Sequence, residues 1–201
     1  MSANTTSDIT AYIRYGSEKK FSSDGLKILG FMFGTKPTVR PHIDYMVSKA
    51  KKKLWSLRHL KRAGMEQQDL LKIFNSVIRP TLEFAAATFH SMLTSEMSDE
   101  IEYIQRRASK IIFGWDSHYR DLVSDGKLET LAQQRETLTL NFAKKAQASD
   151  RFRDWFPERQ YSGFNLRSEK RFEESFARTT RLQNSPVFYM RRQLNKLYSA
   201  D

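Results

Sequence analysis

The sequence predicts a mainly α-helical protein with a small β element at its N-terminus, a helical bundle after it, and a basic C-terminal tail that contains a final helix. Apolar residues recur at spacings of three and four over most of residues 42–149, which is the period of amphipathic helices. Runs of β-branched and aromatic residues precede residue 34. With 201 residues, 14 Phe, 8 Tyr and 3 Trp, the chain can fill the core of one domain.

The β element is predicted from two short runs of β-favouring side chains, Ile9 to Tyr15 and Leu26 to Phe33. The residues between them, Gly16 to Lys20 and Ser22 to Gly25, have a composition typical of turns. We therefore expect two antiparallel strands within residues 8–33. An element of this size is not stable alone in water, so it has to pack on another part of the chain.

The helical part is predicted to contain several separate helices. The expected ranges are residues 42–62, 66–78, 82–92, 95–113, 128–148 and 186–198, with a short piece at 118–123. Pro80 either breaks the second helix or restarts it. Thr94 or Ser95 can cap the helix that ends at Phe113, and the acidic start and basic end of that helix suit its macrodipole. Within it, Glu102 and Arg106 have the spacing of a surface ion pair.

Two expectations concern the last third of the chain. On the helix at 128–148, one apolar side is predicted to consist of Leu131, Leu138, Phe142 and Ala146. Residues 156–183 mix Pro, Gly, aromatic and charged residues without a clean period, so this stretch is expected to wrap the surface or to become ordered on binding.

The charge of the chain points to a polyanionic partner. The formal net charge is +11 and the sequence pI is near 9.8. Residues 40–62 carry eight basic residues against one acid, Asp44, whereas residues 63–104 carry two basic residues against seven acids. The helix at 42–62 is therefore the candidate that faces phosphates. Its predicted nucleic-acid-binding residues are Lys49, Lys52, Lys53, Trp55, Arg58, Lys61 and Arg62.

An ordinary explanation competes with this one, because a run of lysines is often only the solvated face of an amphipathic helix. Against that explanation, Lys49, Lys52 and Lys53 have almost no acid at i,i+4 to neutralise them. Trp55 and Arg58 could stack on or bridge to nucleic acid, although a tryptophan at this position is equally typical of a core edge.

The sequence contains no recognisable catalytic or metal-binding constellation. It has no cysteine, no two adjacent Asp residues and no Tyr/Phe-x-Asp-Asp motif, and its four histidines are scattered. We expect no catalytic residue, no metal, no cofactor and no small-molecule substrate. There is also no apolar run of the ~20 residues that a membrane span needs, and no signal-peptide pattern. An intracellular protein of the nucleus or cytoplasm is expected, not a secreted or membrane protein.

Several motifs, in a fixed order, resemble a known family. Leu26 to Phe31 is similar to a primer-grip motif, and a Pro/His step follows at Pro41-His42. The segments Leu54–Gly64 and Ile78–Ala86 are similar to thumb helices, and Ile101–Ile112 is similar to the pattern Leu-Glu-x-x-Gln-Arg-Arg-Ala-x-x-Ile-Ile. The similarity extends to Leu128–Leu131 with Arg135, and to Asn184-Ser185-Pro186. Over roughly residues 26–195 the chain thus resembles the C-terminal third of a non-LTR (LINE-type) retrotransposon reverse transcriptase, an RNA-directed DNA polymerase.

The resemblance implies a division of the chain and a function. Residues 1–34 would be residual palm strands with primer-grip-like Leu29, Gly30 and Phe31, residues 35–149 a thumb-like helical domain, and residues 150–201 a basic extension. The carboxylates of the palm are missing, so the resemblance implies a remnant that holds RNA or RNA–DNA template–primer duplex through its phosphates without catalysis. The alternative is an inert pseudogene product, or an interaction module that packs on a separate polymerase palm chain. A membrane-surface role for the basic helix is a third and weaker reading.

Overall fold

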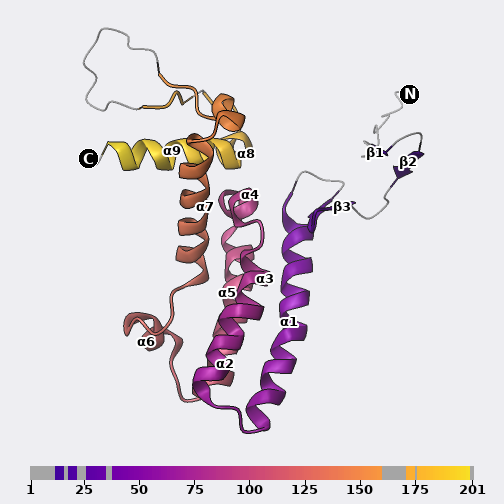
Figure 1. The fold of residues 1–201 in the computed structure, drawn as a ribbon, viewed down its shortest axis with the longest axis vertical. Coiled ribbons are helices and arrows are strands. Elements are labelled where there is room, and N and C mark those ends of the chain that lie inside the picture. Colours follow the sequence, from indigo (N-terminus) through magenta and orange to yellow (C-terminus); the bar gives the residue numbers. More distant parts are fainter. Residues whose placement is uncertain are drawn as a thin grey trace, which may run out of the picture.

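The computed structural model describes residues 12–15, 18–21, 26–34, 38–159, 171–174 and 176–199. As predicted, the described chain is mainly α-helical, with a small β element before the first helix. The long helical segments run along the long axis of the molecule, and the C-terminal helix lies across one end (Figure 1).

The N-terminal β element consists of two separate hairpins. Strand β1 (Tyr12–Tyr15) pairs with β2 (Glu18–Phe21), and β3 (Leu26–Ile28) pairs with β4 (Phe31–Phe33), both antiparallel. The prediction of one strand over residues 26–33 that pairs with residues 9–15 is wrong, and residues 9–11 lie outside the described residues. The chain reverses midway through the second run because Leu29 and Gly30 adopt positive φ angles of 48° and 88°.

Helix α1 (Arg40–Arg62) leads into α2 (Gln67–Ile73), which returns beside it. A π-helical turn (η1, Phe74–Ile78) and α3 (Arg79–Glu83) continue α2. The chain stays helical across Pro80 because this residue lies in the first turn of α3, where its missing N–H is tolerated. The break comes after α3 instead, at Ala85, whose φ is 60°.

After the break, α4 (Ala86–Phe89) and a 3-10 turn (η2, His90–Met92) lead into α5 (Ser95–Phe113). The Thr94 hydroxyl accepts a hydrogen bond from the Met97 amide at 3.2 Å, which confirms the predicted cap of α5. A short α6 (Tyr119–Ser124) then precedes α7 (Leu131–Gln147), which begins with a capping box between Thr130 and Gln133.

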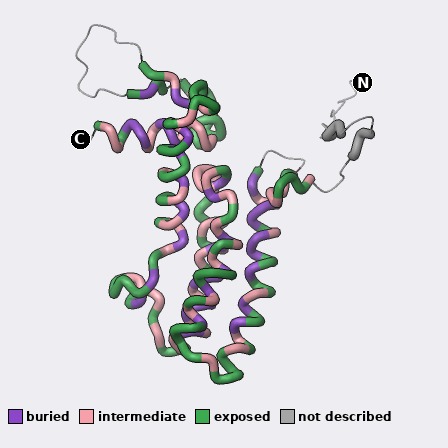
Figure 2. The backbone as a smooth tube through the Cα atoms, viewed as in Figure 1, coloured by how far each residue is buried: buried purple, intermediate pink, exposed green. Residues whose placement is uncertain are grey.

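The main core lies between α1, α2, η1, α3, α4 and α5, and includes the start of α7. Its fully buried members include Ile43, Ala50, Leu57, Leu70, Phe74, Ile78, Leu82, Phe89, Ile101, Ile104, Ala108 and Leu131. Buried residues follow one side of α1 and of α7 (Figure 2). Each fully buried aliphatic or aromatic side chain contributes about 1.5–3 kcal/mol, so this core holds the long helices together.

A second, smaller core joins the far end of α7 to the C-terminal segment. It contains Ala143, Ala146, Phe156, Phe172, Met190 and Leu194. The 3-10 segment η3 (Asp150–Trp155) and the short α8 (Thr180–Gln183) flank it, and α9 (Pro186–Tyr198) lies across the end of α7 (Figure 1). The Asn195 side chain accepts from the Phe172 amide at 2.8 Å and donates to the Phe172 carbonyl at 3.0 Å. Within the predicted irregular stretch 156–183, Phe156 and Phe172 are therefore packed against α7 and α9.

Candidate nucleic-acid interface

Helices α1 and α5 lie side by side and run in the same direction. At their N-terminal ends the Arg40 guanidinium pairs with the Glu100 carboxylate at 2.8 Å. At their C-terminal ends the Lys61 ammonium donates to the Ile112 carbonyl at 3.3 Å. The parallel arrangement places the basic last turns of both helices at the same end of the molecule, where their charges suit both macrodipoles.

The cations predicted on α1 fall into two groups. Lys49, Lys52 and Arg62 are exposed and Arg58 is half-buried, and within the described residues none of these four has a hydrogen bond or an ion pair. In contrast, the Lys53 ammonium donates to the Val77 carbonyl at 2.7 Å and to the Thr81 hydroxyl at 2.6 Å, and burial lowers its pKa. Lys53 and Lys61 thus hold neighbouring helices rather than point freely into solvent.

The side of α1 next to α5 carries Lys51, Trp55, Arg58 and Arg62, which recur at helical spacing. Lys51 was not among the predicted site residues, but it is exposed and lines a shallow groove together with Tyr103 and Arg106 of α5. The Trp55 side chain is 62% exposed, with the His59 ring at 3.7 Å between centroids. It is therefore not a core residue.

Helix α5 adds basic and aromatic residues that the sequence reasoning missed. Tyr103 and Trp115 are exposed, and the Arg107 guanidinium lies between them, 6.0 Å from the Tyr103 ring centroid and 5.6 Å from that of Trp115. The Lys110 ammonium lies 5.4 Å from the Trp115 ring. The i, i+4, i+7 spacing of Tyr103, Arg107 and Lys110 was a signal in the sequence that could have revealed this strip.

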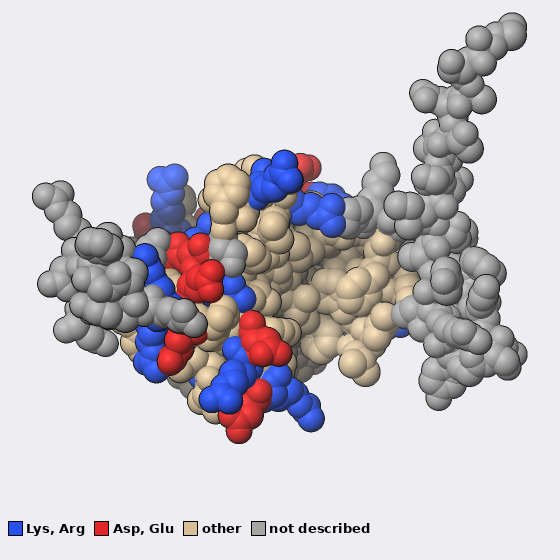
Figure 3. Space-filling view, turned by 90° about the horizontal axis from the view of Figure 1, so that it is seen from above, with Lys and Arg blue, Asp and Glu red and all other residues tan. Residues whose placement is uncertain are grey.

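These residues of the two helices together form what we call the basic-aromatic face. It consists of Lys51, Trp55, Arg58 and Arg62 on α1, of Tyr103, Arg107 and Lys110 on α5, and of Trp115 just after α5. Acids gather instead near the N-terminal ends of the two helices, where Glu96, Asp99 and Glu100 line the upper part of the groove. At the opposite end of the molecule, the visible described surface has Lys and Arg interspersed with Asp and Glu beside an uncharged area (Figure 3).

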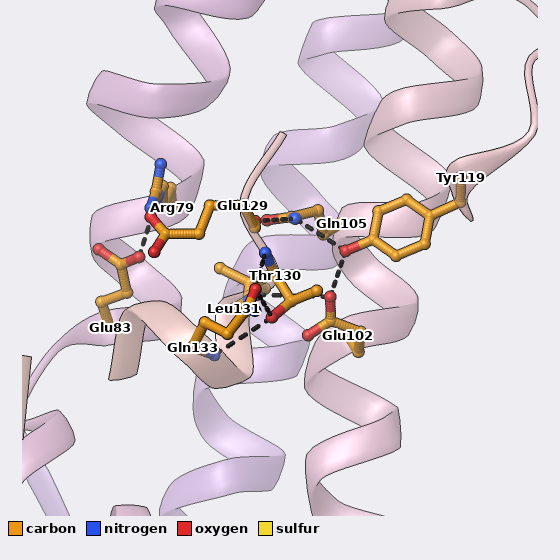
Figure 4. Close-up of polar contacts among 9 residues, drawn as sticks. All are labelled: Arg79, Glu83, Glu102, Gln105, Tyr119, Glu129, Thr130, Leu131 and Gln133. Atoms are coloured by element: carbon orange, nitrogen blue, oxygen red, sulfur yellow. Dashed lines mark hydrogen bonds and ion pairs between the residues drawn. The ribbon is translucent and has the colours of Figure 1, made fainter. Parts of the chain in front are cut away.

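A polar network on another side of α5 holds the connection that follows Trp115. The Gln105 amide donates to the Tyr119 hydroxyl at 2.9 Å and to the Glu129 carbonyl at 2.7 Å (Figure 4). Glu102 accepts from the Tyr119 hydroxyl and, at 3.4 Å, from the Leu131 amide. Burial, followed by the hydrogen bond to Glu102, raises the pKa of Tyr119, so this phenol stays protonated.

This network shows that the predicted Glu102–Arg106 ion pair is wrong. The Glu102 carboxylate turns toward α6 and α7, and the Arg106 guanidinium donates to the Asp99 carbonyl at 3.3 Å. Nearby, Arg79 pairs with Glu83 at 2.7 Å and with Glu129 at 3.6 Å (Figure 4). These contacts fasten α6 and the start of α7 to α3 and α5, and so leave the basic-aromatic face uncovered by the described chain.

The three primer-grip-like residues lie in the β3–β4 hairpin, at the end of α1 opposite to the basic-aromatic face. Leu29 forms the tip and is 95% exposed. A side chain on Gly30 would come within 3.1 Å of the Phe84 ring, so the hairpin approaches α3 closely at this point. Phe31 stacks on His42 with 4.0 Å between ring centroids, and the Met32 amide donates to His42 Nδ1 at 3.4 Å.

Two other kinds of feature are absent from the described part of the chain. There, no three His, Asp or Glu side chains gather in a way that could hold a metal ion. None of the described helices combines the length and the apolar character needed to cross a membrane. Comparison of the chain with protein-family models, with curated proteins and with solved structures finds no match.

Proposed function

We propose that this chain binds nucleic acid through its phosphates, with the basic-aromatic face of α1 and α5 as the contact surface, and does no chemistry of its own. The family resemblance of the sequence suggests the form of the ligand, an RNA or an RNA–DNA template–primer duplex held by a remnant of a retrotransposon reverse transcriptase. The absence of a Tyr/Phe-x-Asp-Asp motif from the sequence supports a role in binding rather than in polymerisation.

The observation that carries the proposal is a set of unpaired cations on one face. Lys51, Arg58 and Arg62 have no acidic partner within the described residues, and they share one side of a 23-residue helix. Because no acid neutralises an unpaired cation on a rigid helix, its charge can attract an anionic ligand. Each phosphate that it neutralises releases a counterion. Surface lysines and arginines that only solubilise a protein are usually mixed with acids, as at the end of the molecule seen in Figure 3.

The test is the salt dependence of binding to an RNA–DNA hybrid by the intact chain and by the triple variant Lys51→Gln, Arg58→Gln, Arg62→Gln. Each lost phosphate contact flattens the slope of log affinity against log salt by about 0.7 to 0.9, so the triple variant should lose about two to three units. At ~0.1 M salt, this corresponds to a loss of affinity on the order of a hundredfold.

A matched control removes three charges elsewhere, through Gln at Arg151, Arg178 and Arg181, which are exposed residues of the C-terminal segment. The control should change affinity much less, because only the net charge differs. Equal losses in both variants would mean that net charge alone attracts the nucleic acid. Failure of the intact chain to bind either the hybrid or an RNA at low salt would exclude the proposal.

A second candidate function rests on the β3–β4 hairpin. Ile28, Leu29 and Phe33 are exposed apolar side chains on a two-stranded element whose outer edges pair with no other strand of the described residues. This favours a module that packs on another protein, such as the polymerase palm that the resemblance suggests. In that case the variant Leu29→Lys would abolish association with the partner and leave binding to nucleic acid unchanged.

A further inference from the structure

Three aromatic rings on the basic-aromatic face are more exposed than packing requires. The side chains of Trp55, Tyr103 and Trp115 are 62%, 47% and 66% exposed. The chain has only three tryptophans, and two of them lie on this face. Their exposure contributes little to folding, because a ring stabilises the fold mainly through the apolar area that it buries.

Each ring lies beside a cation of the same face. Arg107 approaches both Tyr103 and Trp115, Lys110 approaches Trp115, and on α1 the spacing of Trp55 places it between Lys51 and Arg58. The contacts within the protein explain part of this arrangement, since an exposed cation–π pair contributes about 0.5–1 kcal/mol. They do not explain why the same alternation occurs on two separate helices that meet at one surface.

Alternating cations and exposed rings suit one class of nucleic acid better than another. A duplex offers phosphates to a protein surface, but its base faces are stacked inside. An unpaired strand offers both phosphates and base faces, and each base can stack on an aromatic side chain regardless of its sequence. A membrane surface would require a continuous apolar face, whereas the apolar side of α1 is buried in the core.

We propose that the basic-aromatic face binds an unpaired, single-stranded stretch of nucleic acid, with bases stacked on Trp55 and Trp115 and phosphates held by Arg58, Arg62 and Arg107. This inference rests on the proposed function, because it needs a face that binds nucleic acid. The proposed function expects a duplex that is held along its backbone, whereas this inference expects a strand whose bases are exposed.

The experiment measures binding of the intact chain to a single-stranded RNA of about 12 nucleotides and to the corresponding RNA–DNA hybrid, at one salt concentration. The single strand should bind more tightly and should quench tryptophan emission. Trp55→Ala and Trp115→Ala should each weaken single-strand binding by about five- to a hundredfold and should weaken hybrid binding much less, because the base faces of a hybrid are stacked inside the duplex.

Two further variants serve as controls. Phe176→Ala removes an aromatic ring that is 88% exposed and lies outside the face, and it should leave single-strand binding unchanged. Trp115→Phe keeps a flat ring at the site, so it should recover most of the affinity that the alanine variant loses. This recovery separates lost stacking from a local change in the end of α5, and circular dichroism of each variant checks that it is folded.

The outcomes separate the two proposals. If the hybrid binds as tightly as the single strand and the tryptophan variants bind both normally, the stacking proposal is overturned and the proposed function stands. If neither nucleic acid binds, both are overturned. If vesicles of phosphatidylserine and phosphatidylcholine bind in preference to the single strand, with the same losses in Trp55→Ala and Trp115→Ala, the face is a membrane-surface site and the stacking proposal is wrong.

Discussion

The two ends of the parallel pair α1 and α5 use the same kinds of residue for different purposes. At the N-terminal ends, Arg40 is paired with Asp44 at 2.9 Å and with Glu100 at 2.8 Å, and the Phe31 ring lies against the buried His42. At the C-terminal ends, arginines and lysines lack acidic partners within the described chain, and the aromatic rings are exposed. At the N-terminal end, charged and aromatic side chains are thus engaged in contacts that stabilise the fold. At the C-terminal end, side chains of the same kinds are exposed and could contact a ligand.

The helix macrodipole accounts for only part of this difference. It favours acids near the N-terminal ends and bases in the last turns; α5 follows that rule at both ends, whereas α1 follows it only in its last turn, since its first turn carries no acid. The effect falls off within one turn, yet Lys51 and Arg58 lie one to three turns before the end of α1, and Arg107 lies before the last turn of α5. The macrodipole therefore does not account for the cations that precede the last turns, whereas the proposed binding surface would account for them.

The largest expected effect tests whether aromatic rings at the two ends differ in role. Phe31→Ala removes a half-buried ring that packs on His42 and on the main core, so it should lower the free energy of unfolding by about 2 kcal/mol. Trp115→Ala removes an exposed ring with two cation–π contacts and should cost less than about 1 kcal/mol. Urea denaturation followed by circular dichroism measures both. If both variants lost the same free energy of unfolding, aromatic rings at the two ends would not differ in their role in stability.

The helices of this fold were predictable because their apolar residues keep one period over many turns. Helix α5 begins and ends where its cap and Gly114 predicted, and α1 needed only two more residues at its start. The hairpins were not predictable in the same way. The apolar pattern of residues 26–33 fits one long strand as well as two short ones. The reversal between the two strands depends on the left-handed backbone at Leu29 and Gly30.

Helix α7 shows why the buried side of a helix can differ from its most apolar side. The sequence predicted a side with Leu138 and Phe142, but the structure fully buries Arg135 and Thr139, while Phe142 is 38% exposed. The Arg135 guanidinium donates to the Ser98 hydroxyl at 3.0 Å, and the charges of Glu83 and Glu102 offset part of the effect of burial, which lowers its pKa. These partners lie far away in sequence, so no local pattern indicates them.

The candidate site was predictable in outline only. Charge counting indicated α1 as the candidate, but it could not tell which lysines the fold would use, since that depends on the carbonyl groups of neighbouring helices. It also missed the strip on α5, because the four acids in the first half of that helix offset the three bases in its second half when the helix is counted as a whole. The juxtaposition of two helix ends is a property of tertiary structure.

The second prediction concerns pH at the N-terminal end. His42 is fully buried, and burial lowers its pKa by more than a backbone contact with Phe84 raises it. The unfolded chain therefore binds more protons than the folded chain below the ordinary histidine pKa of about 6.5. Stability should be complete above that pH and should fall as the pH is lowered toward the folded-state pKa. Burial also lowers the pKa of His90, which adds to the effect.

The variant His42→Phe keeps an aromatic ring against Phe31 and removes the proton-binding group, so its denaturation midpoint should depend less on pH between 5 and 7. His59→Gln, at an exposed position near the C-terminal end of α1, is the control and should keep the dependence of the parent. A pH dependence that is unchanged in His42→Phe would show that the buried imidazole does not limit stability in acid.

The smallest expected effect compares two lysines of α1 that lie two residues apart. The Lys53 ammonium bridges to η1 and α3, and Lys53→Gln should cost about 1 kcal/mol of stability through the lost hydrogen bonds. The Val77 carbonyl would keep its bond from the Thr81 hydroxyl at 3.0 Å, which limits the loss. Lys51 faces α5 without a partner in the described chain, so Lys51→Gln should change stability by no more than ~0.5 kcal/mol.

Binding should rank the two variants in the opposite order. Lys51→Gln should flatten the salt dependence of nucleic-acid binding by about 0.7 to 0.9, the effect of one phosphate contact, whereas Lys53→Gln should leave it unchanged because its ammonium is already engaged. The pair is matched in residue type, helix and charge removed, so the two variants differ in the surroundings of the side chain that is removed. If Lys53→Gln flattens the slope as much as Lys51→Gln does, the Lys53 ammonium exchanges its bonds to Val77 and Thr81 for a phosphate contact when nucleic acid binds. Both sides of α1 would then belong to the binding surface.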